Sequence, residues 1–498
     1  MPDLPARFGA MSARMRLALL GAFGVLAGLG QAPLDIWPAT IIGIAALMLA
    51  HQGTQTTRAA ALQAWAFGAG YFALSLRWIV EPFLVDVARH GWMAPFAVTL
   101  MAAGAGLFWA VAAYGAARLA PRSALMLALG LVWAEATRSL ILTGFPWALL
   151  GHIWVPTPIA QLAAFGGPHL LTIVTVLTGW GVALVVTRRW SGAIVLATVV
   201  AEGLWLRAGP APAPVADAPI VRLAQPNAPQ HLKWDPAYRD VFLQRLVSFT
   251  ESGVIPDLVV WPETSVPTLL NFIENDLSLL ADAARGAPLV FGIQRRDTEG
   301  RFYNSLIALN PEGEIAQIYD KRHLVPFGEY MPGGALARSM GLTGLADTMG
   351  SGFAPGRDAG LVDLPGIGGA VPLICYEGIF AEEIYRGPDR PRLLLLITND
   401  AWFGQAAGPY QHLAQARLRA IEQGLPMVRV ANTGVSAMID ARGRIIAEIP
   451  LGIDGVIDSP LPAALPVTPY ARWGEWPFFL MLIFLTLGLY VVVRRNSD

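Results

Sequence analysis

Long apolar runs constrain the folding of this chain more than any other feature of its sequence. A helix needs roughly 20 apolar residues to cross the hydrocarbon core of a bilayer, and runs approaching this length recur through residues 1–206 and once more near the end. With 54% hydrophobic and only 14% charged residues, the chain lacks the composition of a soluble protein. We therefore predict an integral membrane protein with eight transmembrane helices: residues 17–34, 38–51, 59–79, 93–117, 123–143, 168–187, 190–206 and 476–493.

Arginine clusters between the predicted spans indicate how the protein is oriented. Cytoplasmic loops of membrane proteins carry an excess of basic residues. With eight spans, four such sites fall on the same side, which predicts cytoplasmic N- and C-termini and an external, periplasmic domain between the last two spans. We interpret the first run as a span and not as a cleavable signal peptide, because no convincing cleavage site follows it. The four sites are Arg7, Arg14 and Arg16; Arg118 and Arg122; Arg188 and Arg189; and Arg494 and Arg495.

Tryptophans and two charged residues mark the predicted membrane region. Tryptophans at span ends are typical of an interfacial aromatic belt; here they are Trp78, Trp92, Trp147, Trp473 and Trp476. Inside the fifth predicted span, Glu135 and Arg138 stand one helical turn apart and can pair. A structural ion pair and a role in binding lipid headgroups both remain open for these two residues.

The central part of the chain has the pattern of a separate α/β domain. A stiff Pro/Ala-rich linker, residues 208–219, divides the membrane region, residues 1–207, from this domain, residues 220–462. Residues 470–498 form the last span and the tail. Strand-like runs alternate with helical patterns, which predicts helices packed on sheets. The predicted strands are 220–225, 258–261, 289–293, 305–309, 370–374, 393–398, 427–431 and 435–439, and the helices are 236–252, 271–285 and 408–424.

Three residues of scarce or reactive types follow predicted strands in this domain. Cys375 is the only cysteine, and Lys233 and Lys321 are the only lysines among 35 basic residues. Glu263 lies in the segment V-V-W-P-E-T-S, just after the predicted strand 258–261. Open α/β sheets place their sites at the carboxyl ends of strands, so a thiol, an amine and a carboxylate form a candidate set for covalent catalysis.

In such a set the thiol must become a thiolate before it can attack a carbonyl group. Glu263 can take the proton of the Cys375 thiol, and Lys321 can stabilise the thiolate and then an oxyanion. Glu329 and Glu377 are second carboxylates that could hold Lys321 or orient the base. Taken singly, each residue also has an ordinary explanation: a buried core cysteine, a capping or ion-paired glutamate, a surface lysine. The sequence contains no G-x-S-x-G, H-E-x-x-H or G-x-x-x-x-G-K-[ST] motif, and its net charge of −1 gives no global field for nucleic acid.

Three segments resemble a known family. The motifs V-V-W-P-E-T, Y-D-K-R-H-L-V-P-F-G-E-Y and I-C-Y-E contain Glu263, Lys321 and Cys375, and they are similar to the Glu-Lys-Cys triad of the nitrilase/carbon–nitrogen hydrolase superfamily. With membrane spans on both sides, nearly the whole chain resembles the apolipoprotein N-acyltransferases of bacterial lipoprotein maturation.

This resemblance implies a nitrilase-like αββα sandwich in the periplasm of an inner-membrane protein, and no cofactor or metal. Cys375 would attack a phospholipid ester to give a thioester, and the amine of a diacylglyceryl-cysteine apolipoprotein would then accept the acyl chain. Membrane lipids would be further partners. Glu329, Tyr376 and Glu377 would support the triad, and the expected substrate-binding residues are Trp234, Trp147, Trp402 and His412.

The sequence leaves open the role of one long loop and two alternative functions. The glycine-rich stretch 329–355 also carries Met, Leu and Phe, so it is either an irregular surface loop or a membrane-facing lid that excludes water. The nearest alternative function is a membrane-tethered amidase that uses water. A transporter or receptor with an external ligand-binding domain is the third, and it would not need Cys375.

Overall fold

A computed structural model describes residues 4–207, 217–334, 352–357, 360–385 and 387–495. The chain divides into two compact units, one comprising Met1–Pro210, Ala406–Ala414 and Thr468–Asp498, the other Ala211–Gln405 and Gln415–Val467. Each unit is described by itself. Most of the predicted lid at 329–355, and most of the linker at 208–219, lie outside the described residues.

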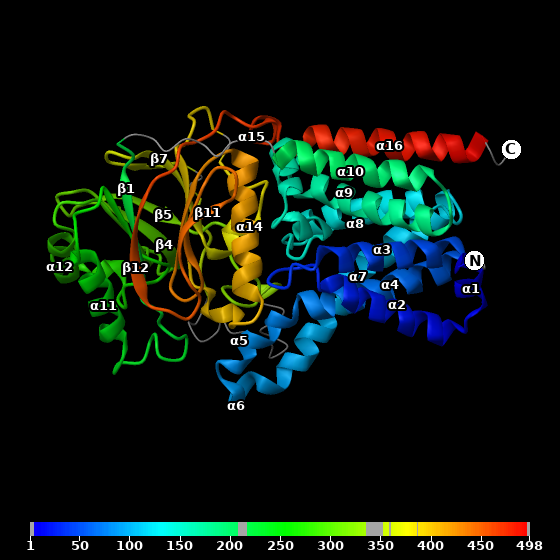
Figure 1. Ribbon diagram of the computed structural model, residues 1–498. Helices are drawn as coiled ribbons and strands as arrows, with labels where there is room; N and C mark the ends of the chain where they lie inside the picture. Colours follow the sequence, from blue (N-terminus) through cyan, green and yellow to red (C-terminus); the bar gives the residue numbers. More distant parts are fainter. Residues whose placement is uncertain (1–3, 208–216, 335–351, 358–359, 386, 496–498) are drawn as a thin grey trace. The chain divides into compact units, whose positions relative to one another are not determined.

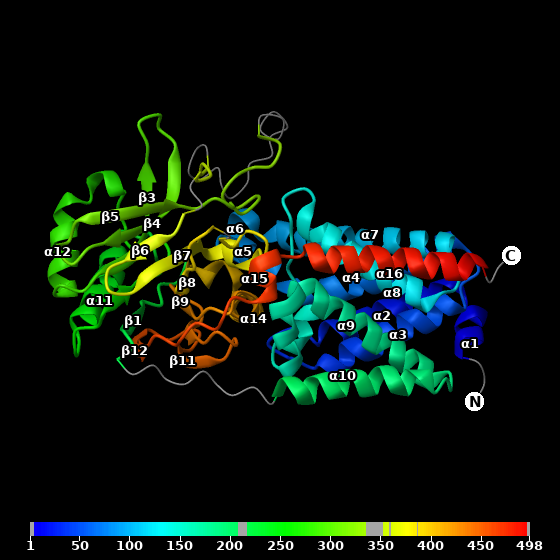
Figure 2. The same ribbon diagram turned by 90° about the horizontal axis from the view of Figure 1, so that it is seen from above.

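The first unit is helical, and its long helices run side by side (Figure 2). One of them overlaps each of the eight apolar runs predicted from the sequence. They are α2 (Ala13–Gly28), α3 (Trp37–Gln52), α4 (Thr57–Ser75), α7 (Ala94–Leu119), α8 (Ala124–Leu140), α9 (Ala163–Val186), α10 (Ser191–Arg207) and α16 (Trp476–Arg495). Short helices α1 (Leu4–Ala10), α5 (Glu81–Leu84), α6 (Val87–His90) and α15 (Pro469–Trp473) complete the unit.

Fewer than eight of these helices are long and apolar enough to cross a membrane by themselves. In the described residues, Val87–Leu119, Pro158–Val186 and Trp476–Arg495 meet that standard, and Thr57–Ser75 with Arg77–Leu84 would be a fourth span bent by 63°. Trp37–Gln52 and Ser191–Leu206 are apolar but shorter. A helix of 16 residues such as α3 is about 24 Å long, which is less than the roughly 30 Å hydrocarbon core. The count of eight spans therefore stays a prediction.

A buried ion pair on α8 orders the loop that follows it. Arg138 lies 3.1 Å from Glu135, and both side chains are almost fully buried. Glu135 also accepts a hydrogen bond from the backbone N–H of Leu150, while Arg138 donates to the carbonyls of Phe145 and Trp147. Because both charged side chains are buried within the protein, the geometry favours the structural ion pair over a headgroup-binding role.

Burial separates the tryptophans expected at the membrane interface into two groups. Trp92, Trp473 and Trp476 are exposed on the protein surface, as an aromatic belt requires. Trp78 and Trp147 are buried, and their rings lie 4.5 Å apart. The interpretation of these two as lipid-facing anchors was therefore wrong, because the loop after α8 folds Trp147 into the protein, where its ring packs against that of Trp78.

The second unit contains two sheets, each with six strands among the described residues. The first has the order β12 (Gly455–Pro460), β1 (Ile220–Gln225), β2 (Leu258–Val260), β3 (Leu289–Arg296), β4 (Phe302–Leu309), β5 (Ile315–Asp320). The second has the order β11 (Ile445–Ile449), β10 (Ser436–Ile439), β9 (Met427–Ala431), β8 (Leu393–Thr398), β7 (Gly368–Ile374), β6 (Val362–Leu364). In both, three neighbouring strands are parallel (β1–β2–β3 and β7–β8–β9) and the flanking pairs are antiparallel.

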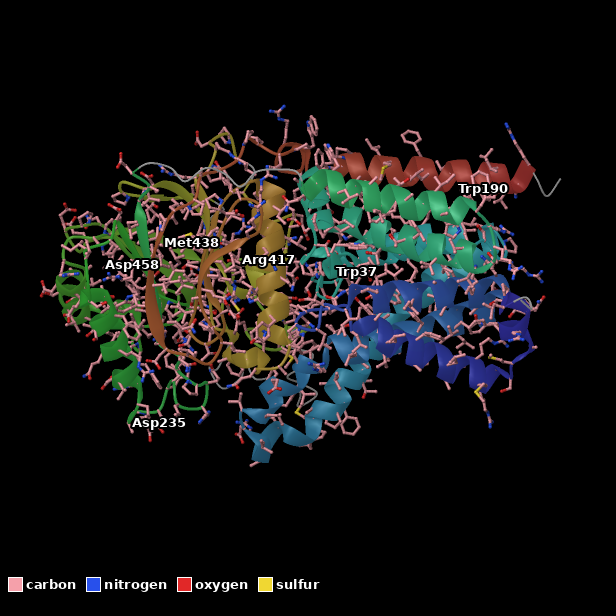
Figure 3. All side chains as sticks on the ribbon, in the orientation of Figure 1. Trp37, Trp190, Asp235, Arg417, Met438 and Asp458 are labelled. Carbon is pink, nitrogen blue, oxygen red and sulfur yellow. The ribbon has the colours of Figure 1, made fainter. Side chains whose placement is uncertain are left out.

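The two sheets face each other between helices. Strand β1 packs against β9 and β10, and β4 packs against β7. Helices α11 (Arg239–Glu251) and α12 (Glu274–Ala284) cover the outer face of the first sheet, and α14 (Gly408–Gln423) lies along the second (Figure 1). Buried side chains such as Met438 fill the unit (Figure 3). The predicted nitrilase-like αββα sandwich is confirmed.

The strands that the sequence did not reveal lie at or near the sheet edges. All eight predicted strands are present, and β5, β6, β11 and β12 are additional. Strand β8, Leu393–Thr398, is buried at all six positions, whereas β11 alternates between partly buried and exposed residues. A central strand buried on both faces gives a continuous apolar run, but a half-exposed edge strand gives only a weak alternating pattern.

Candidate active site

Glu263 lies in the turn that follows the short buried strand β2. The next residue, Thr264, has φ = +46°, a left-handed conformation that is uncommon for residues with a branched β-carbon. Strand β3 approaches this turn at Gly292, where a β-carbon would lie 2.5 Å from the backbone nitrogen of Thr264 and 2.6 Å from the Cα of Glu263. Glycine at 292 is therefore a steric requirement for the position of the carboxylate.

We expect Gly292→Ala to lower both stability and activity. The added methyl group must push the Glu263 turn away from β3, since both nearest atoms belong to backbone. Overpacking of this kind costs about 1–3 kcal/mol, which thermal unfolding in detergent would measure. Gly455→Ala is the matched control, because this glycine lies in β12 of the same sheet, is not left-handed, and a β-carbon there would meet only the Ile449 side chain, at an ordinary 3.6 Å. Equal activity losses in the two variants would contradict the steric argument.

Lys321 follows β5 and lies between two carboxylates. Its Nζ is 2.9 Å from Oε1 of Glu329 and 3.7 Å from Oε1 of Glu263, and its side chain is 1% exposed. The backbone N–H of Val325 donates to the other oxygen of Glu329 at 2.8 Å. Glu329 is thus held in place and in turn holds the ammonium group beside Glu263.

Asn304 on β4 is a site residue that the sequence analysis missed. Its Nδ2 donates to Oε1 of Glu263 at 2.6 Å and lies 3.3 Å from Oε1 of Glu329. The backbone carbonyl oxygen of Asn304 accepts a hydrogen bond from the backbone N–H of Lys321. The sequence did contain a signal for this residue, an amide side chain in the largely apolar segment F-Y-N-S-L-I-A-L. A polar side chain that is buried in such a strand needs a specific hydrogen-bond partner.

Cys375 occupies a sharp turn between β7 and the following 3₁₀ helix, Cys375–Ile379. Its φ is +51°, a strained conformation of the kind that clusters at functional sites, and the residue is 5% exposed. Glu377 fixes this turn by accepting the backbone N–H of Ile374 through Oε2 at 2.7 Å.

Glu377 also connects the cysteine turn to the lysine loop. Its Oε1 accepts the Tyr319 hydroxyl at 2.9 Å and the backbone N–H of Arg322 at 2.7 Å. These contacts flank Lys321 in the chain. Glu377 therefore orders the backbone around both Cys375 and Lys321, whereas Glu329 makes the direct contact with the ammonium group.

Burial and neighbouring charges set the protonation of the two reactive groups. Burial raises the pKa of the Cys375 thiol, and the Glu263 carboxylate raises it further, while Lys321 opposes both. Burial alone would lower the pKa of Lys321, but the carboxylates of Glu329 and Glu263 outweigh it and raise that pKa above its usual value. The resting pair is therefore a neutral thiol and a charged ammonium, so the thiol must lose its proton to a base when it attacks.

The expected substrate-binding residues fall in different parts of the protein. Trp234 is 39% exposed and follows Lys233, and Trp402 is partly buried in the 3₁₀ helix Asp400–Phe403. Trp147 and His412 belong to the helical unit and are fully buried, with their rings stacked 5.9 Å apart. Tyr376 is buried, and its ring lies 5.5 Å from that of His323.

The described residues contain no group of three or more His, Cys, Asp or Glu side chains that could hold a metal ion. Among the described residues, the site brings together a thiol, two carboxylates and an ammonium group. Such a set can form and break an acyl–sulfur bond with the carboxylate as the proton carrier.

Comparison with known proteins identifies the family. Residues 234–465 match the carbon–nitrogen hydrolase family, and residues 23–181 match the apolipoprotein N-acyltransferase N-terminal domain. A solved CN-hydrolase superfamily protein from Xanthomonas campestris aligns with 54% of this chain and 97% of its own, at 22% identity and a TM-score of 0.36.

Relatives named apolipoprotein N-acyltransferase match almost the entire chain. The protein from Rhodopseudomonas palustris is 37% identical over 97% of this chain and 95% of its own length. That from Brucella melitensis is 37% identical over 96% of both chains, and that from Caulobacter vibrioides 36% identical over 94% and 92%. The chain therefore belongs to the apolipoprotein N-acyltransferase family, and it is an acyltransferase of the carbon–nitrogen hydrolase superfamily.

Proposed function

We propose that this enzyme transfers an acyl chain from a phospholipid to the N-terminal amine of a diacylglyceryl-cysteine apolipoprotein, through a thioester on Cys375. The observation that carries the proposal is the buried cluster of Glu263, Lys321 and Glu329, in which the charges of Glu263 and Lys321 act on the pKa of the Cys375 thiol. A thioester retains enough acyl-transfer potential to form an amide, so the reaction needs neither ATP nor a cofactor.

In the first half-reaction, Glu263 takes the thiol proton as the sulfur attacks the carbonyl carbon of the phospholipid ester. Asn304 and Lys321 both approach Oε1 of Glu263, so Oε2 is the oxygen better placed to accept the proton. Lys321 remains charged because its pKa is raised, and it stabilises the tetrahedral oxyanion. The glycerol oxygen leaves with the proton from Glu263, which gives the thioester and a lysophospholipid.

In the second half-reaction, the apolipoprotein amine attacks the thioester carbonyl. Glu263, again ionised, takes the proton that the amine nitrogen loses, and the Cys375 sulfur leaves and recovers a proton. In both half-reactions, Glu329 holds Lys321 in place and Glu377 holds the Cys375 turn in its conformation. Tyr376 is the residue that follows the nucleophile in the chain. Trp234, Trp147, Trp402 and His412 are the proposed substrate contacts.

The proposed setting is the bacterial inner membrane, which residues 1–207 and 470–498 cross as eight helices. Exposed apolar side chains on the long helices, such as Leu100, Val111 and Phe484, support a lipid-facing surface. The arginine clusters put both termini in the cytoplasm. Residues 220–462, joined by the linker 208–219, then form the periplasmic catalytic domain, where both lipid substrates are available.

One labelling experiment tests the function. Purified enzyme in detergent is incubated with phosphatidylethanolamine that carries a radiolabelled sn-1 acyl chain. We expect a hydroxylamine-sensitive label on Cys375, which a diacylglyceryl-cysteine lipopeptide removes as an amide. Discharge by water at the same rate with and without lipopeptide would assign an amidase-like hydrolase instead. No label at all would overturn the proposed thioester on Cys375.

A further inference from the structure

The only two lysines of the chain both contact Glu263. Lys321 approaches the carboxylate, as described above. Lys233 contacts the backbone of the same residue: its Nζ donates to the backbone carbonyl of Glu263 at 3.0 Å and to the Thr264 hydroxyl at 2.8 Å. In a chain that otherwise uses arginine for its basic residues, both compact ammonium groups contact Glu263, Lys321 at its carboxylate and Lys233 at its backbone carbonyl.

Lys233 is built into the protein and is not a surface charge. It lies in the segment between β1 and α11, where its backbone N–H donates to the carbonyl of Pro229, and the residue is 6% exposed. Its Nζ lies 5.6 Å from the centre of the Trp234 ring. A buried ammonium needs acceptors to offset its desolvation, and it finds them in the turn that contains Glu263 and the left-handed Thr264.

We infer that Lys233 is a positioning residue, which fixes the Glu263–Thr264 turn and adds a second positive charge that favours the Cys375 thiolate. This inference rests on the proposed roles of Glu263 and Cys375. Lysine suits this place because a compact ammonium group can donate to a carbonyl and a hydroxyl together, whereas the planar guanidinium group has a fixed, larger fork.

The charge on Lys233 depends on pH in an accessible range. Burial lowers the pKa of Lys233 to about 8, and the charge of Glu263, together with that of Cys375 when the thiol is ionised, only partly offsets this effect. Other charged groups nearby are Lys321 across Glu263 and, on the same segment, Asp235 and Arg239. Lys233 therefore carries its charge below about pH 8 and loses it above, while Lys321, whose pKa is raised, stays charged.

Alkylation of Cys375 tests the inference without using either lipid substrate. Because the chain has one cysteine, the mass increase of the intact protein with iodoacetamide reports on this site alone. We expect Lys233→Met to slow alkylation at pH 7 by about tenfold, the effect of one pKa unit on the thiolate fraction. The rate–pH curve of the unmodified protein should flatten near pH 8, and that feature should be absent from Lys233→Met.

Two further variants separate position from charge. Lys233→Arg keeps a positive charge above pH 8, so it should restore part of the rate at pH 7 and remove the flattening. The control is Arg239→Met, which removes a half-exposed positive charge from the same segment and should leave the curve unchanged. In the acyl-transfer assay, Lys233→Met should lower kcat with KM unchanged, whereas a rise in KM alone would make Lys233 a substrate-binding residue and overturn the inference.

A milder variant keeps the test decisive if Lys233→Met does not fold. Thr264→Val removes one acceptor of the ammonium group but keeps the branched side chain, so the pKa of Lys233 should fall and the flattening should move below pH 8. Folded Thr264→Val or Lys233→Met with the alkylation curve of the unmodified protein would overturn the inference. Failure of phospholipid transfer with these alkylation results intact would instead count against the proposed function alone.

Discussion

Cys375→Ala is expected to abolish acyl transfer, with a loss of at least about 10³-fold in the conversion of a diacylglyceryl lipopeptide. The reason is that the proposed reaction forms its covalent bond to this sulfur, and the chain has no second cysteine to replace it. The radiolabelled acyl adduct should disappear together with the transfer activity, as measured by gel autoradiography of the purified protein.

The folding of the variant separates lost chemistry from lost structure. Cys375 is almost fully buried at a left-handed turn, but alanine removes only one atom, so the melting temperature in detergent should change little. Lys321→Met is the companion variant: it leaves the thiol in place and removes the ammonium group between Glu263 and Glu329. A folded Cys375→Ala protein that still transfers acyl chains would refute the thioester route.

Asp400→Ala is expected to destabilise the catalytic unit by about 3–5 kcal/mol, the cost of leaving a buried charge without its partner. Asp400 and Arg429 are both fully buried and 2.6 Å apart, and Asp400 also accepts the Thr398 hydroxyl at 2.9 Å. Urea unfolding followed by tryptophan fluorescence would measure the loss. Asp240→Ala is the control, because its contact with Arg239 is exposed and such pairs contribute little.

The same substitution should make Cys375 more reactive. The negative charge of Asp400 contributes to the raised pKa of the Cys375 thiol, so its removal lowers that pKa and increases the thiolate fraction at neutral pH. Faster iodoacetamide alkylation in a less stable protein is therefore the expected combination. Unchanged stability would show that Arg429 finds another acceptor, and slower alkylation of the folded variant would contradict the assigned sign.

The sequence predicted the residue types of the candidate site and their positions after strands, but not the contacts among them. Glu263 and Cys375 each come after an apolar run, and this position is visible in the sequence; the runs form β2 and β7, each with a parallel neighbour in its own sheet. Asn304 was missed because its contribution comes from a strand that is distant in sequence and pairs only in the folded sheet. Glu377 was predicted to hold Lys321 or to orient the base, whereas its hydrogen bonds to backbone groups of two loops depend on how those loops approach each other.

The helical unit shows the same limit. Apolar runs identified where helices form, but the loop after α8 buries Trp147, which the sequence placed at the membrane surface. Helix lengths near the threshold for spanning, such as the 16 residues of α3, leave the number of spans a prediction. Hydropathy averages over a window and carries no information on how a connecting loop folds back.

The sequence alone determined the division into a membrane part and an α/β domain, because apolar runs and strand–helix alternation are local patterns. It also determined the family, because the motifs around Glu263, Lys321 and Cys375 are short and contiguous. Only the tertiary structure decided which charged and polar groups contact each other. Glu329 holds Lys321, Asn304 donates a hydrogen bond to Glu263, and Lys233 donates a hydrogen bond to the backbone carbonyl of Glu263. These contacts join residues up to dozens of positions apart, so distance and burial, which set their energies, exist only once the sheets have assembled.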